Sequence, residues 1–209
     1  MQLKITLLTL LLSTFLFSSS TNNIKNMILN LKKQIRNGDT NANFKLGVIY
    51  YKKRNLDLAM LYFTRAADYD NKKAKYNIAI IYGNKNFRSY NPKQAFKLYK
   101  ELAQQDYDKA QIKVALALLH GIGVEKDYQM ARQWLERAYF KHNNLEAGCY
   151  LAYIYTYGRG VLVNLGRARK LALKGYNKKI HYCRKIYNNF NLYKYKQDKG
   201  FKFGYYSNF

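Results

Sequence analysis

The chain has 209 residues, with 37 Lys or Arg against 12 Asp or Glu, which gives a formal net charge of +25. Its three His are scattered, without the close pairing that a zinc site usually shows. Such a basic chain attracts anions of many kinds, so its charge limits the class of partner more than the activity.

Residues 1–20 have the pattern of a secretory signal peptide. One Lys precedes an apolar run from Ile5 to Phe17, and three Ser follow where cleavage needs small residues. The run is shorter than the about 20 apolar residues of a membrane span, although an uncleaved membrane anchor is the alternative because no charge occurs between Lys4 and Lys25. We therefore expect a periplasmic or secreted protein.

Residues 21–38 are predicted to form a capping helix. Five apolar residues between Ile24 and Ile35 recur at helical spacing, and Asn37-Gly38 follows as a stop signal. A helix lying on a membrane surface would show the same pattern. Capping is the preferred interpretation, because an uncapped stack of repeats exposes its apolar end.

Residues 39–175 hold a pattern that occurs four times, at about 42–73, 74–109, 110–146 and 147–175. Each copy opens with Ala, carries a small residue five positions later and a bulky one eight positions after the Ala. The three sets are Ala42, Ala74, Ala110 and Ala147; Gly47, Ala79, Ala115 and Ala152; and Tyr50, Tyr82, Leu118 and Tyr155.

A second segment of each copy carries another Ala, preceded at four residues by Asn or Asp. These pairs are Asn55 and Ala59, Asn91 and Ala95, Asp127 and Ala131, and Asn164 and Ala168. A short side-chain oxygen at that place accepts hydrogen bonds from the free backbone N–H groups of a helix start. The sequence therefore predicts an all-α protein in which each repeat is helix A, a turn and helix B.

The third copy carries the most specific motif, Gly121-Ile-Gly123-Val124-Glu-Lys-Asp127-Tyr-Gln-Met-Ala-Arg-Gln-Trp134, and Gly158-Arg-Gly160-Val161 repeats its turn. This pattern resembles the Sel-one-like repeat (SLR) family, relatives of the tetratricopeptide repeats. The resemblance implies a right-handed alpha-solenoid, with the four glycines as structural turn residues. Two copies depart from it: the second has Lys85, Phe87 and Arg88 at the turn, and the first lacks about four turn residues.

Residues 176–209 follow the repeats. We predict that helix B of the fourth repeat ends near Gly175 and that 178–187 forms a fifth helix A. Beyond Asn188 the Asn, Tyr, Lys and Phe residues show no helical period, so this basic aromatic tail either stays disordered or folds back over the last helices. Residues 147–209 hold 13 Lys or Arg and a single acid, Asp198.

The two cysteines are considered in light of the resemblance, because some secreted SLR proteins join neighbouring repeats by disulfides. Cys149 stands where that pattern places a helix A cysteine, but the helix B position that should hold its partner cysteine carries Tyr139. Cys183 lies near the corresponding point of the fifth helix A. A Cys149–Cys183 disulfide and two unpaired buried thiols both remain open.

An enzymatic function finds little support in the sequence. After residue 20 the serines are Ser89 and Ser207, and neither lies in a serine-hydrolase motif. Cys149 with His142 is a weak nucleophile–base candidate, and we expect Glu136 and Glu146 to be solvated surface charges. We predict neither enzyme activity nor a cofactor or metal site, with an envelope enzyme of the beta-lactamase-like SLR type as the alternative.

The resemblance implies a protein–protein interaction module whose partner binds the concave helix A face. Candidate surface residues are those that the helix A core leaves over: Lys45, Lys75, Asn77, Lys113 and Tyr150. The SLR proteins that it resembles include immunity proteins and host-interaction factors. An anionic envelope polymer or lipid is the alternative partner, while a secretory signal argues against nucleic acid. The oligomeric state is not predicted.

Overall fold

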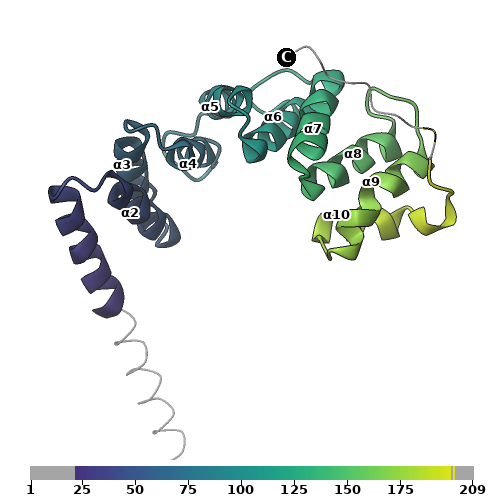
Figure 1. Cartoon of the computed structure of the whole chain (residues 1–209). Coiled ribbons are helices and arrows are strands. Elements are labelled where there is room, and N and C mark those ends of the chain that lie inside the picture. Colours follow the sequence, from purple (N-terminus) through teal and green to yellow (C-terminus); the bar gives the residue numbers. More distant parts are fainter. Residues whose placement is uncertain (1–21, 199, 201–209) are drawn as a thin grey trace, which may run out of the picture. The chain divides into compact units, whose positions relative to one another are not determined.

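The computed structural model describes residues 22–198 and residue 200. The described chain is helical, with helices joined by short turns (Figure 1). The first covers residues 22–36. The others are α2 (Thr40–Lys52), α3 (Leu56–Ala67), α4 (Lys72–Tyr82), α5 (Pro92–Gln104), α6 (Asp108–His120), α7 (Tyr128–His142), α8 (Leu145–Tyr157), α9 (Leu165–Asn177), α10 (His181–Asn189) and the 3₁₀ helix η1 (Leu192–Lys194).

The four predicted N-caps are confirmed. Asn55, Asn91, Asp127 and Asn164 begin α3, α5, α7 and α9, and each side chain accepts a hydrogen bond from a backbone N–H three residues on. The helix A segments are α2, α4, α6 and α8. Their opening Ala and the small residue five positions later are all buried, as the close approach of paired helices requires.

The chain divides into two compact units, Met1–Ile78 and Ala79–Phe209. In the first unit, the helix of residues 22–36 packs through Leu31 against Leu46 and Tyr62. The ring of Phe63 lies directly over Gly47, where a Cβ would collide with it. Both contacts belong to the hydrophobic core of this unit. The turn after the first helix contains Gly38, whose φ of 89° favours glycine.

In the second unit, each helix from α5 to α10 packs on its neighbour in the chain, and α10 also contacts α8. All four predicted turn glycines have positive φ: 71° at Gly121, 73° at Gly123, 64° at Gly158 and 68° at Gly160. Gly123 has a second constraint, because a Cβ there would collide with the Pro92 carbonyl oxygen at the start of α5. The turn of the second repeat lacks these glycines, and its Phe87 is buried.

The C-terminal helices differ from the prediction by a few residues. The α9 helix continues to Asn177, two residues past Gly175, and α10 runs from His181 to Asn189 after a turn with Lys179 at φ 59°. Of the two alternatives for the tail, the structure shows the folded-back one as far as residue 198. Leu192 is fully buried, and Tyr195 to Asp198 run along α9.

Candidate binding groove

A groove of about 540 Å³ lies in the second unit, between α5 and α7 with α6 as its floor. These three helices follow one another in Figure 1. The residues that line the groove are Phe96, Lys100 and Gln104 from α5, Val114 and Leu118 from α6, Val124 and Asp127 from the turn, and Met130, Trp134 and Arg137 from α7. Its volume lies within the range of ligand-binding pockets.

Helical spacing brings these side chains together. Phe96, Lys100 and Gln104 are each one turn apart, so they form a single stripe along α5. A matching stripe of Met130, Trp134 and Arg137 follows α7. The start of α7 is fixed by Asp127, whose Oδ1 accepts a hydrogen bond of 2.8 Å from the backbone N–H of Met130.

The floor of the groove belongs to the hydrophobic core, whereas one edge is open to solvent. Val114, Leu118 and Trp134 are 1%, 5% and 8% exposed, but Met130 is 38% exposed. Phe96 is half-buried on the opposite wall. A ligand would therefore meet a ready apolar surface formed by Phe96 and Met130.

The end of the groove near Gln104 carries positive charge. The Arg137 guanidinium lies over the Trp134 ring, 5.9 Å from its centroid, and its Nε donates a hydrogen bond of 2.9 Å to Asp106. Hydrogen bonds from Lys141 and Arg137 lower the pKa of Asp106, against the opposing effect of burial. Within the described chain, no ion pair or hydrogen bond engages the Lys100 ammonium or the Gln104 amide, and Lys100 is exposed.

The equivalent groove one repeat later, over α8, is filled by charged side chains. Glu136 on α7 forms an ion pair of 2.8 Å with Arg132, and the Arg167 guanidinium from α9 lies 4.8 Å from the centroid of the Tyr155 ring. Arg167 also bonds Asp198, at 3.0 Å, so the C-terminal segment covers this place. We call the first the open groove and this one the filled groove.

The expectation that Glu136 is a solvated charge was wrong, while that for Glu146 is confirmed. The Glu136 side chain, on α7, is 1% exposed and lies close enough to Arg167 of α9 to interact with its charge, and Glu146 is exposed at the start of α8. Burial raises the pKa of Glu136 above its usual 4.5, and Arg132 and then Arg167 act in the opposite direction. Two cations next to this buried acid thus offset part of its desolvation.

None of the five surface residues predicted from the sequence lines the open groove. Lys45 is exposed on α2, and the other four are half-buried on α4, α6 and α8. The Asn77 amide donates to the Lys73 carbonyl oxygen at 2.8 Å. The Tyr150 ring lies 4.6 Å from that of Tyr182, and burial followed by the Glu146 charge raises the pKa of Tyr150.

The residues of the open groove escaped sequence reasoning because its floor uses ordinary core positions of the repeat. The available signal was a difference between copies. Phe96, Lys100 and Met130 stand in one copy where Arg132, Glu136 and Arg167 stand in the next, at a spacing of 36 or 37 residues.

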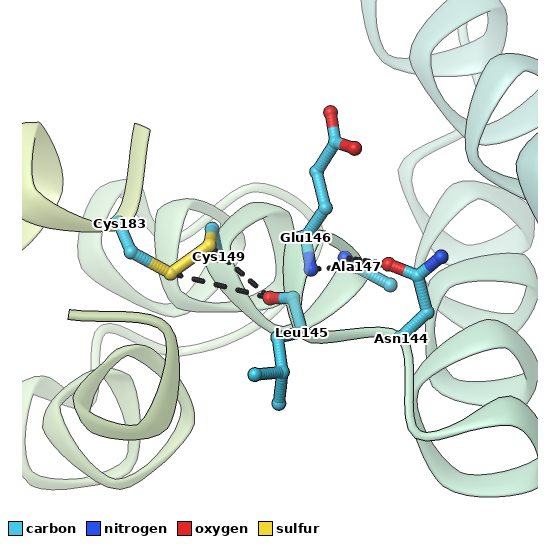
Figure 2. The surroundings of a disulfide bond; sticks show 6 residues. All are labelled: Asn144, Leu145, Glu146, Ala147, Cys149 and Cys183. Atoms are coloured by element: carbon cyan, nitrogen blue, oxygen red, sulfur yellow. Dashed lines mark hydrogen bonds between the residues drawn. A yellow bond between two sulfur atoms is a disulfide. The ribbon is translucent and has the colours of Figure 1, made fainter. Parts of the chain in front are cut away.

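Cys149 and Cys183 form a disulfide that joins α8 to α10 (Figure 2), with their Cα atoms 4.8 Å apart. Figure 2 shows both sulfur atoms beside the Leu145 carbonyl oxygen at the start of α8. Because its sulfur is bonded and fully buried, Cys149 carries no thiol that could act with His142 as a nucleophile. No cluster of His, Cys, Asp and Glu that could hold a metal ion occurs among the described residues.

The four helix pairs coincide with matches to a known family. The Sel1 repeat matches residues 40–69, 72–107, 108–139 and 146–179. The chain belongs to the Sel1-repeat family. Sel1-repeat proteins generally mediate protein–protein interactions and are mostly non-enzymatic. The resemblance seen in the sequence and the all-α repeat fold are thereby confirmed.

Similar proteins come from animals and from a plant. Protein sel-1 homolog 2 of Mus musculus is 27% identical over 125 residues, which are 58% of this Sel1-repeat chain but only 18% of that protein. An F-box protein of Arabidopsis thaliana is 31% identical over 84 residues, or 40% of the chain and 23% of that protein. The chain therefore spans less than a quarter of the length of these relatives.

Two crystal structures share the fold. A Sel1 repeat protein from Oxalobacter formigenes has a TM-score of 0.60 at 28% identity, covering 70% of this chain and 61% of the other. A protective antigen of uropathogenic Escherichia coli strains, with an SLR fold, has a TM-score of 0.64 at 24% identity, covering 76% and 36%. The second likeness shows the fold alone.

The predicted signal peptide, residues 1–20, lies outside the described residues. Among the helices that the structure describes, none combines the length and the apolar character that crossing a membrane requires.

Proposed function

We propose that this Sel1-repeat protein is an extracytoplasmic scaffold that binds a protein partner in the open groove over α6. The observation that carries the proposal is the exposed apolar edge at Met130, with the half-buried Phe96 opposite it, above a buried floor and with cations at one end. An apolar centre with a charged border is the arrangement in which protein interfaces concentrate their binding energy.

The sequence of residues 1–20 and the disulfide support a place outside the cytoplasm. The first 20 residues have the charge, apolar run and small residues of a secretory signal. Disulfides persist in oxidising compartments such as the periplasm, and Cys149 and Cys183 are bonded here. A scaffold in that place could serve as an immunity protein or as a host-interaction factor, because either role requires only binding.

Two tests address the location. Expression of the full chain followed by cell fractionation and intact-mass measurement should give a protein that starts near Thr21 in the periplasm or medium. A full-length protein in the membrane fraction would favour the uncleaved anchor instead, and a full-length cytoplasmic protein would contradict the proposed location.

The binding site is tested by affinity capture from envelope extract with the tagged full chain, washed at low and at high salt. Met130→Glu places a charge on the open groove, and Lys113→Glu changes the helix A face as a control. The scaffold proposal expects a stoichiometric protein that survives high salt and is lost with Met130→Glu alone. Loss with Lys113→Glu alone would move the site to the helix A face.

A basic chain could instead bind an anionic polymer, such as lipopolysaccharide or anionic lipid. The affinity of such a binder falls steeply with salt, whereas an apolar interface is less sensitive. If the bait retains only anionic polymer and high salt removes it, the scaffold proposal is wrong.

A further inference from the structure

The two grooves suggest what kind of segment the open one accepts. We propose that it binds a partner segment in which a large apolar side chain stands next to a carboxylate, so that the carboxylate meets Lys100. This inference rests on the proposed function and specifies the chemistry of the partner at that site.

The apolar side chain has a defined place. At the end of the groove where α5 and α7 begin, Phe96 faces Met130 across the floor residue Leu118, and Val124 closes the turn. Among the residues that line this end of the groove, Asp127 is the charged one, and its Oδ1 is already engaged with the backbone of α7. An aliphatic or aromatic side chain would remove apolar surface from water here without displacing any internal ion pair of the chain.

The carboxylate has a defined place at the other end. Lys100 and Gln104 lie one turn apart on α5, and within the described chain neither side chain is engaged by another residue. Arg137 stands opposite them, although Asp106 already accepts its hydrogen bonds. An ammonium with a neighbouring free amide can bind a carboxylate through charge-assisted hydrogen bonds. Asp127 disfavours the reverse orientation of the segment.

In the filled groove, the chain's own side chains occupy the positions that are open to a partner in the open groove. There, a carboxylate, Glu136, occupies the position equivalent to Lys100, and its cation Arg132 occupies the position equivalent to Phe96. Arg167 occupies the position of Met130 and covers Tyr155. The open groove has the opposite charge at the Lys100 position, and no described carboxylate pairs with that ammonium, so a carboxylate bound there would come from a partner.

Trp134 gives a direct measurement, since it is the only Trp of the chain and lines the groove. We would titrate the full chain with a short helical peptide carrying Phe and Glu one turn apart and follow the Trp134 fluorescence. Two companion peptides replace Glu with Lys, or Phe with Ala. The expected result is saturable binding of the Phe–Glu peptide, with at least about tenfold weaker binding of either companion.

Charge reversal on the protein completes the test. Lys100→Glu should weaken the Phe–Glu peptide by about tenfold or more and restore binding of the Phe–Lys peptide. The matched control is Lys97→Glu, which makes the same charge change on an exposed residue of α5 outside the groove. It should change the affinity by less than about threefold because solvent screens that charge.

Several outcomes would overturn the inference. Equal binding of the Phe–Glu and Phe–Lys peptides, both abolished by Met130→Glu, would retain the protein-binding groove and reject its preference for acid. A partner captured by the full chain but indifferent to both Met130→Glu and Lys100→Glu would reject the groove itself.

Two other occupants would also contradict the proposal. A change in Trp134 fluorescence with protein concentration alone, matched by dimer formation in light scattering, would assign the groove to a second copy of the chain. A gain of about tenfold in peptide affinity when the aromatic residues of 201–209 are replaced by Ser would assign it to the chain's own C-terminal segment.

Discussion

The open groove over α6 and the filled groove over α8 have the same helical framework. The first exposes an apolar surface, whereas the second is occupied by the chain's own charged side chains. In both, two successive B helices flank an A helix whose inward side chains are buried. They differ in most of the lining side chains, and among these Phe96, Lys100 and Met130 correspond to Arg132, Glu136 and Arg167. In one repeat these residues leave an apolar surface exposed, and in the next they form an internal ion pair and a cation–π contact.

The comparison teaches that repeat number alone does not locate a binding surface. Core Ala and Gly positions repeat because neighbouring helices must approach closely, whereas residues between successive B helices are free to vary. A binding site can then arise in one repeat while its neighbour contributes only to stability.

The largest expected effect comes from the buried floor residues, Trp134 in the open groove and the equivalent Leu171 on α9, which are 8% and 2% exposed. Trp134→Ala should lower the free energy of unfolding by about 4 kcal/mol and the equivalent Leu171→Ala by about 3 kcal/mol, because each leaves a cavity in the core. Met130→Ala, on the exposed edge, should stay within about 0.5 kcal/mol. Urea unfolding followed by circular dichroism measures all three. If Met130→Ala lowered the free energy of unfolding as much as Trp134→Ala, the claim that only the floor residues stabilise the fold would be wrong.

A second prediction breaks the filled groove. Arg132→Met removes the ion-pair partner of the buried Glu136 and should cost about 3 kcal/mol at neutral pH. The same urea series below pH 4.5 should show a smaller cost, since Glu136 is then protonated. The double variant Arg132→Met with Glu136→Gln should recover part of the loss. Equal costs at both pH values would mean that Glu136 does not depend on this pair.

The pH dependence of Glu136 gives the third prediction. Because its pKa is raised in the folded state, its stabilising contribution is complete below its usual pKa of 4.5 and is lost as the pH rises through the folded value. The free energy of unfolding of the native chain relative to Glu136→Gln should therefore fall as the pH rises from 4.5 through the folded pKa of Glu136. The opposite slope would show that Arg132 and Arg167 outweigh burial.

The smallest expected effect concerns the segment that covers the filled groove. Asp198→Ala removes the carboxylate that bonds Asn164 and Arg167, and should lower the free energy of unfolding by about 1 kcal/mol or less. Glu125→Ala makes the same charge change on an exposed residue of the α6–α7 turn and is the matched control. Hydrogen exchange at the start of α9 should increase only in the first variant. If both variants show the same hydrogen exchange, the contacts of Asp198 do not stabilise the start of α9.

Much of the fold could be predicted from the sequence because it depends on short-range rules. A capping oxygen at Asn55 or Asp127 and the Ala four residues later specify where a B helix begins, whatever the rest of the chain does. The boundary between α9 and α10 was less certain, since Lys179 adopts a positive φ that a sequence pattern does not indicate. The tail was ambiguous because its folded-back form depends on contacts with α9, far away in the chain.

The candidate site was harder to predict, for a physical reason. Whether Glu136 is solvated is decided by tertiary packing, which also brings the charge of Arg167 on α9 near it, so the pattern of α7 alone gave the wrong answer. Likewise, Met130 is an exposed apolar residue, and it forms part of a binding surface only together with Phe96 on the other side of α6. Single helices show periodicity, but a groove is a property of three helices together.

Gly175 has a consequence for how this sequence can vary. It lies on α9 directly beneath the disulfide, where a Cβ would collide with the Cys183 sulfur and come within 3.2 Å of the Cys149 sulfur. A residue larger than Gly at 175 is therefore excluded while the bridge is present. A descendant that lost both cysteines would be released from that restriction, and Ala at 175, a better helix former, could then become fixed there.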